Sequence, residues 1–93
     1  MTEISRQVTI VNELGLHARA ASKLVQLASK FPVEIKLERE DMNVNAKSIM
    51  GVLMLAAAKG TDLTLTATGE QGQAQEAVDA IVGLIQQRFG EDR

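Results

Sequence analysis

The chain is 93 residues long, and its 45% hydrophobic and 24% charged residues are typical of a single folded domain, here residues 1–93. It contains no Cys and a single His, which excludes disulfides, thiolate clusters and imidazole-rich metal sites, so we expect neither a metal nor a cofactor. The net charge of −2 gives no bulk attraction to nucleic acid or to anionic lipid.

Three elements are predicted in the first half of the chain. Residues 7–11 alternate apolar and polar side chains, as a half-buried strand does. After a turn at Gly15, residues 18–29 carry apolar side chains at helical spacing, and Pro32 ends this helix because the residue before a proline avoids helical backbone angles. Residues 33–38 again alternate, which predicts a second strand.

Four elements are predicted in the second half. Residues 42–46 form a short strand that pairs with the preceding one as a hairpin. A helix is expected from residue 49 to about 57, ended by Gly60. Residues 63–68 alternate leucines and alanine with threonines, which indicates a strand, and residues 73–89 predict a helix with one stripe that runs from Ala74 to Arg88.

The resulting order is βαββαβα, without a repeat or a linker. Strands with one polar face and helices with one apolar stripe pack in two layers, so we expect an α+β fold with helices on one face of a mostly antiparallel sheet. The other face would be solvated, through Thr9, Glu34, Lys36, Thr64 and Thr66. No apolar run approaches the ~20 residues that span a bilayer and no secretory signal is visible, so we expect no membrane insertion and a cytoplasmic location.

The only His lies where a loop becomes a helix. Unpaired amides and the positive end of the helix dipole make such a terminus a natural anion site. A neutral His17 imidazole there is a nucleophile, and a phosphoryl group on its ring would meet the backbone amides of Ala18 and Arg19. The Arg19 guanidinium could also hold phosphate oxygens, and the small Ala18, Ala20 and Ala21 would leave room for a donor. The alternative is that His17 only caps the helix and Arg19 is a solvated charge.

The helix predicted after Ser48 is apolar on more than one side. Val52, Leu55 and Ala56 would form its buried face. An adjoining face carries the flexible apolar side chains Ile49, Met50 and Leu53, with Met54 beyond it. This second face is either a docking patch for a partner or the sign of a more deeply buried helix. Ser48 stands at the N-cap position, which capping alone would explain, and Met42 is interpreted as core filler.

Two segments resemble the two signatures of the HPr family, the histidine-containing phosphocarriers of the bacterial phosphoenolpyruvate-dependent phosphotransferase system (PTS). The active-site signature is similar to Leu14-Gly15-Leu16-His17-Ala18-Arg19-Ala20-Ala21, and the regulatory-serine signature to Asn45-Ala46-Lys47-Ser48-Ile49-Met50-Gly51-Val52. The resemblance extends over essentially the whole chain. It implies an open-faced β-sandwich with a four-stranded antiparallel sheet and three helices on one face.

The resemblance also implies residue roles. His17 would accept a phosphoryl group on Nδ1 from phosphorylated enzyme I and pass it to an enzyme IIA domain in sugar transport. Arg19 would steady the phosphate, and Ser48 would be the target of an HPr kinase/phosphorylase. The partner-docking residues would be Ile49, Met50 and Leu53. Such a protein is a monomeric carrier rather than a stand-alone enzyme, and we expect no substrate pocket.

Several features leave alternatives open. Ala20 stands where the family usually has a proline, which puts the rate of phosphotransfer in question. Residues 53–60 and 89–92 are similar to the nitrogen-related paralogue of HPr, whereas the context of Ser48 favours ordinary HPr. A regulatory docking module that uses the Ser48 patch and carries no phosphoryl group is a further hypothesis. An RNA-binding module is disfavoured because no predicted strand carries an exposed aromatic side chain.

Overall fold

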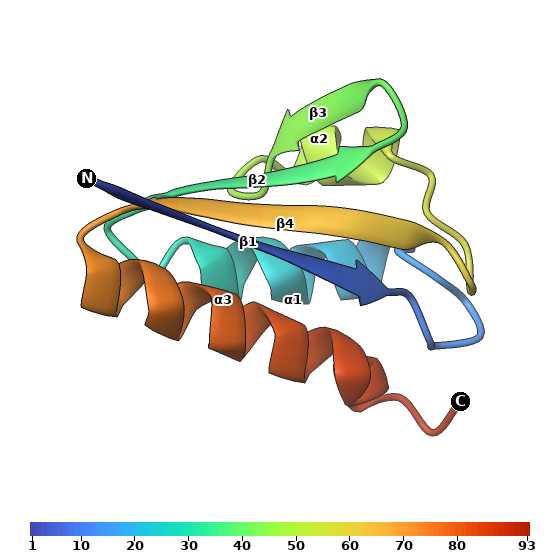
Figure 1. The fold of residues 1–93 in the computed structure, drawn as a ribbon. Coiled ribbons are helices and arrows are strands. Elements are labelled where there is room, and N and C mark those ends of the chain that lie inside the picture. Colours follow the sequence, from blue (N-terminus) through green and yellow to red (C-terminus); the bar gives the residue numbers. More distant parts are fainter.

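A computed structural model describes all 93 residues and confirms the βαββαβα order (Figure 1). Its elements are β1 (Thr2–Thr9), α1 (Ala18–Ala28), β2 (Glu34–Arg39), β3 (Met42–Asn45), α2 (Ile49–Met54), β4 (Asp62–Gly69), α3 (Gln71–Gln86) and a short 3₁₀ turn, η1 (Arg88–Gly90). None of the helices is both long and apolar enough to cross a membrane.

The four strands form one antiparallel sheet in the order β1-β4-β2-β3. The central strand β4 alternates buried Leu63, Leu65 and Ala67 with half-buried threonines, as its sequence predicts. In this register Val8 of β1 lies opposite Leu63, and Leu37 of β2 lies opposite Leu65, so apolar side chains of neighbouring strands share one face.

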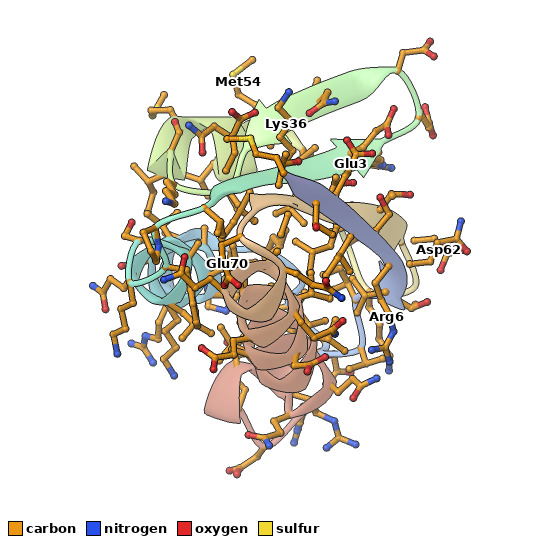
Figure 2. All side chains as sticks on the ribbon, turned by 60° about the vertical axis from the view of Figure 1, so that its left-hand side comes forward. Glu3, Arg6, Lys36, Met54, Asp62 and Glu70 are labelled. Carbon is orange, nitrogen blue, oxygen red and sulfur yellow. The ribbon has the colours of Figure 1, made fainter.

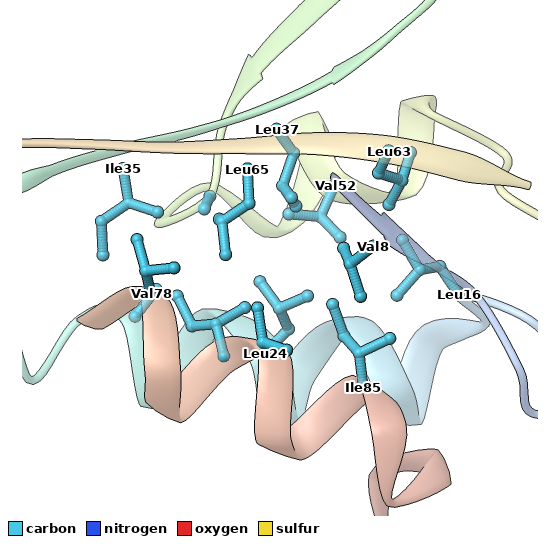
Figure 3. Close-up of a cluster of buried hydrophobic side chains, with 14 of the residues drawn as sticks. Val8, Leu16, Leu24, Ile35, Leu37, Val52, Leu63, Leu65, Val78 and Ile85 are labelled. Atoms are coloured by element: carbon cyan, nitrogen blue, oxygen red, sulfur yellow. The ribbon is translucent and has the colours of Figure 1, made fainter. Parts of the chain in front are cut away.

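The core lies between this apolar face and the helices. Helices α1 and α3 run under the sheet, and α2 lies beside β3 at its edge (Figure 1). Figure 3 shows side chains from both layers meeting, among them Leu24 of α1, Val52 of α2 and Val78 of α3. The opposite face is polar as predicted, and in Figure 2, where α3 is seen nearly end-on, Glu3 and Lys36 lie on the side of the sheet away from this helix.

The first strand is longer than its sequence pattern indicates. It begins at Thr2, where Thr2 pairs with Gly69, rather than at residue 7, and it ends at Thr9. Its first half is exposed or half-buried because β1 is an edge strand held mainly by backbone pairing with β4. A segment held by backbone pairing does not need alternating apolar side chains, so the sequence pattern gave no sign of the first residues of the strand.

Helix α2 ends at Met54 rather than near residue 57. The carbonyls of Leu55 and Ala56 accept hydrogen bonds from Nη1 of Arg39 at 2.7 and 3.0 Å, and Ala56 has a φ of 49°. Ala56 is therefore exposed and does not belong to the buried face of the helix. The interpretation of Met42 as core filler is also wrong, because it is exposed at the turn end of the β2–β3 hairpin, where it pairs with Arg39.

Helix α3 ends at Gln86, three residues before the predicted limit at residue 89. Arg88 and Phe89 both adopt left-handed backbone angles, with φ values of 58° and 55°. The turn buries the Phe89 ring in the core and leaves Arg88 exposed, so Arg88 does not continue the apolar stripe. The chain after this turn runs toward the loop between β1 and α1 (Figure 1).

Candidate functional site

His17 occupies the N-cap position of α1. Its backbone is extended, its carbonyl oxygen accepts the first helical hydrogen bond from the amide of Ala21 at 2.8 Å, and its Nδ1 accepts a hydrogen bond from the amide of Arg19 at 3.3 Å. The two interpretations of His17 are thus compatible. The ring caps the helix, and the capping atom is the same nitrogen that faces the helix N-terminus, where backbone amides and the helix dipole favour negative charge.

The other ring nitrogen meets a carboxylate from the far end of the chain. Nε2 of His17 lies 2.5 Å from Oε2 of Glu91. The second oxygen of this carboxylate, Oε1, accepts a hydrogen bond at 3.0 Å from the side-chain amide of Asn12, which also donates to the carbonyl of Gly15 at 2.8 Å. The side chains of His17 and Glu91 are 28% and 18% exposed, and Asn12 is fully buried. Asn12, His17 and Glu91 therefore form one partly shielded network, called here the Asn12–Glu91–His17 network.

The turn after α3 places Glu91. The buried Phe89 ring anchors this turn, and the carbonyl of Phe89 accepts a hydrogen bond from Nζ of Lys23 on α1 at 2.6 Å. Gly90 follows with a φ of 79°, a conformation that glycine adopts without strain. The amide of Glu91 then closes the turn by donating to the carbonyl of Arg88 at 2.9 Å.

The network determines the protonation pattern of the site. The Asn12 amide lowers the pKa of the Glu91 carboxyl below its ordinary value of 4.5, and His17 and Lys23 act in the same direction, whereas partial burial opposes them. Glu91 is therefore a carboxylate at neutral pH, and a carboxylate only accepts hydrogen bonds. It follows that Nε2 of a neutral His17 carries the proton and Nδ1 carries the lone pair.

His17 also lines an open hollow of about 480 Å³. Its other lining residues are Glu13, Leu14, Arg19, Glu91, Asp92 and Arg93. No pocket was expected, and this one exists because the chain after Gly90 forms one of its walls. The expectation that Ala20 and Ala21 leave room for a donor is wrong, because both are fully buried beneath the site, whereas Ala18 and Arg19 are exposed. No group of three or more His, Asp or Glu side chains is placed to hold a metal ion.

Comparison with known proteins agrees with this architecture. The family described as PTS HPr component phosphorylation site matches residues 4–87. Phosphocarrier protein HPr of Cupriavidus necator is 52% identical over 88 residues, which cover 95% of this chain and 97% of that protein. The chain belongs to the HPr family. Phosphocarrier protein NPr of Shewanella violacea is similar too, at 46% identity over 98% of both chains.

Solved HPr structures share the fold. The crystal structure of HPr-C-His from Thermoanaerobacter tengcongensis superposes with a TM-score of 0.88 at 43% sequence identity, and the match covers 100% of both chains. The four-stranded antiparallel sheet with three helices on one face is thus the architecture of this HPr family member.

Ser48, in the segment that resembles the second signature of the HPr family, caps α2. Its Oγ accepts a hydrogen bond from the amide of Gly51 at 3.1 Å, so Ser48 has a structural role. The helix it begins is amphipathic and not deeply buried: Val52 enters the core, Leu53 is half-buried, and the exposed apolar side chains are Ile49, Met50 and Met54. These exposed side chains together with Leu53 are called here the α2 patch.

The sequence did not single out Asn12 or Glu91. Asn12 was interpreted as part of a turn, and Glu91 entered only through the similarity of residues 89–92 to the nitrogen-related paralogue. A usable signal was the sequence Phe89-Gly90-Glu91, in which an apolar residue and a glycine at the end of a helical stripe precede an acid. Such a pattern indicates a turn that returns the chain to the core.

Proposed function

We propose that this protein is a PTS phosphocarrier that accepts a phosphoryl group from phosphorylated enzyme I on Nδ1 of His17 and passes it to enzyme IIA domains. The observation that carries the proposal is that the single His of an HPr family member holds Nδ1 at the N-terminus of α1. A phosphoryl group on this atom would lie against the amide of Arg19 and the positive end of the helix dipole.

Arg19 supports the same chemistry. Its side chain is exposed at the rim of the hollow. A free guanidinium beside the nucleophile can hold phosphate oxygens in forked geometry and can exchange them for a partner's carboxylates. The hollow is open, which suits a group that passes between two proteins and never reaches a buried substrate.

We assign partner docking to Ile49, Met50 and Leu53 of the α2 patch. The loop that carries His17 rests on the chain that follows this helix, because the amide of Leu16 donates to the carbonyl of Ala57 at 2.9 Å. The loop that carries the nucleophile is thus tied by its backbone to the segment that follows the α2 patch. Flexible apolar side chains in this patch adapt to more than one partner, as a carrier between enzyme I and enzyme IIA requires.

Ser48 is proposed as a regulatory phosphorylation site for an HPr kinase/phosphorylase. Phosphorylation would add about −1.5 to −2 charges at the edge of the α2 patch and so disfavour partners with acidic rims. We further propose that the protein acts as a single-domain monomer in the cytoplasm.

Two branches of the PTS remain candidates, since the relatives include both HPr and NPr proteins. We favour ordinary HPr because of the context of Ser48. Parallel phosphorylation by enzyme I of the sugar branch and of the nitrogen branch separates them, since the cognate enzyme I should give the higher kcat/KM.

The central test is labelling with phosphoenolpyruvate and enzyme I. We expect an acid-labile, alkali-stable phosphoprotein that is lost in His17→Ala, which contains no other imidazole. Circular dichroism of the variant controls for folding. Absence of labelling with the enzyme I of both branches would overturn the carrier function and leave a regulatory module that docks through Ser48 and the α2 patch.

A further inference from the structure

We propose that Glu91, held by Asn12, is a positioning residue that fixes the Nε2–H tautomer of His17 and thereby presents the Nδ1 lone pair for phosphoryl transfer. The kinetic part of this inference rests on the proposed function. The tautomeric part does not, because it concerns the unphosphorylated imidazole alone.

The ring is held from both sides. Nδ1 accepts from the amide of Arg19 at 3.3 Å, and Nε2 lies 2.5 Å from Oε2 of Glu91. A shift of the ring proton from Nε2 to Nδ1 would place a lone pair against the carboxylate and a proton against the amide, which exchanges two attractive contacts for repulsive ones. A half-turn of the ring about its bond to Cβ would place carbon atoms at both positions and lose both hydrogen bonds, so the observed tautomer and ring orientation are strongly preferred.

The Glu91 carboxylate is itself oriented. Both protons of the Asn12 side-chain amide are used, one on Oε1 of Glu91 and one on the carbonyl of Gly15, and both acceptors require the nitrogen rather than the oxygen at this position. This orientation leaves Oδ1 of Asn12 buried without a partner. An unpaired buried acceptor is unfavourable. We infer that Asn12 is present at this position because of the two hydrogen bonds that its nitrogen donates, to Glu91 and to Gly15.

The approach of Glu91 to His17 requires an uncommon backbone path. Arg88 and Phe89 are consecutive non-glycine residues in the left-handed region, a conformation that persists only where the surroundings enforce it. Burial of the Phe89 ring and the Lys23 contact with its carbonyl supply this enforcement. Strained backbone of this kind is often found at functional sites, and here it brings the Glu91 carboxylate into contact with the ring of His17.

The contact matters chemically when the phosphoryl group arrives. The Nδ1 lone pair forms the new N–P bond while the bond from phosphorus to the donor atom breaks, and that electron pair stays on the donor. Nε2 keeps its proton throughout, so the imidazole ring takes on a positive charge during the transfer. The Glu91 carboxylate faces this charge at Nε2, as the acid of a catalytic triad faces its imidazolium, and no further reactant is needed.

The test compares Glu91→Gln with Glu76→Gln, which makes the same change on the exposed face of α3. With ¹⁵N-labelled His, the shifts of the two ring nitrogens report the tautomer of His17 directly. We expect the parent protein and Glu76→Gln to show the Nε2–H form alone. Glu91→Gln should show a mixture of both tautomers, and Glu91→Asp should recover part of the preference.

The kinetic arm measures phosphorylation by enzyme I. We expect kcat to fall by roughly 10- to 100-fold in Glu91→Gln, with KM for the carrier little changed because the α2 patch is intact. Glu76→Gln should match the parent. Unfolding midpoints of all variants show whether Glu91→Gln acts through loss of the fold. Loss of the fold would appear as a lowered midpoint together with loss of the folded-state ring nitrogen signals of His17.

Each outcome separates the two proposals. If Glu91→Gln keeps the Nε2–H form alone, the positioning role is overturned while the carrier function stands. A changed tautomer with an unchanged kcat overturns the claim that the tautomer presents Nδ1. A changed tautomer in a protein that no enzyme I phosphorylates upholds the positioning of the ring and overturns the carrier function instead.

Discussion

The N-termini of α1 and α2 are built alike and differ in one respect. Each begins with a side chain that accepts a hydrogen bond from a backbone amide, Nδ1 of His17 from Arg19 and Oγ of Ser48 from Gly51. At His17 a second polar group, Glu91, engages the free side of the capping ring. Ser48 has no such second partner and lies beside the exposed Ile49 and Met50.

The difference separates a residue that only caps a helix from one whose side chain makes a further contact. Capping accounts for the single side-chain hydrogen bond of Ser48, but for only one of the two contacts of the His17 ring. The other contact of the His17 ring is with Glu91, a carboxylate from the other end of the chain, which has no role in starting a helix. In our proposal this carboxylate selects the ring nitrogen that accepts the phosphoryl group. Four changes test this comparison, in decreasing order of expected effect.

Phe89→Ala should have the largest effect, because it removes the buried ring that anchors the turn after α3 and leaves a cavity in the core. Loss of a buried aromatic side chain lowers the free energy of unfolding by about 3–5 kcal/mol, which denaturant titration measures. Because the anchor of Glu91 is lost, the surviving folded protein should also show the mixed His17 tautomers expected of Glu91→Gln. A single Nε2–H form in Phe89→Ala would mean that Glu91 needs no anchor.

Gly15→Ala should disturb the loop between β1 and α1, which carries His17. A Cβ at this position would lie 2.5 Å from the carbonyl oxygen of Ala57, and the backbone has a φ of 68°. The strain should lower the free energy of unfolding by about 1–3 kcal/mol. Gly60→Ala is a matched control, because it has a similar positive φ of 90° but nothing within 4 Å of the added Cβ, so the difference between the two variants isolates the clash.

Ser48→Ala should cost about 1 kcal/mol through the lost cap and leave phosphorylation of His17 unchanged. Ser48→Asp keeps a capping oxygen and adds a charge at the α2 patch. If a negative charge at Ser48 inhibits partner docking, Ser48→Asp should slow phosphorylation by enzyme I roughly tenfold while its unfolding midpoint stays near that of the parent. Equal rates in both variants would leave Ser48 as a cap only.

The smallest effect concerns pH. Because the folded state lowers the pKa of Glu91, the carboxylate stabilises the fold fully above its ordinary value of 4.5, and this contribution is lost as the pH falls through the lowered pKa. The difference in free energy of unfolding between the parent and Glu91→Gln should therefore be present at neutral pH and shrink below pH 4.5. A difference that does not depend on pH would contradict the assigned charge state.

Local patterns in the sequence predicted much of this molecule. The alternation in β2 and β4 and the helical spacing in α1 are decided within a few neighbouring residues, so their bounds were close to those observed. His17 and Ser48 were placed correctly at helix starts for the same reason, since capping is a short-range property.

What the sequence could not predict depends on contacts between distant residues. Glu91 is 74 residues from His17 and 79 residues from Asn12, so no local window contains the network. The end of α2 depends on Arg39, 16 residues from the Leu55 carbonyl that it binds. The left-handed turn at Phe89 follows from burial of a ring whose sequence position continues a helical stripe.

The burial of Phe89 has one practical consequence. The protein has no Trp or Tyr and only two Phe, so the aromatic proton region of its NMR spectrum contains two phenyl rings and one imidazole. The Phe89 ring lies in the core and the Phe31 ring is partly exposed, which should separate their signals. A single spectrum of the unlabelled protein therefore reports the packing of the C-terminal residues through the Phe89 ring and the state of His17 through the imidazole.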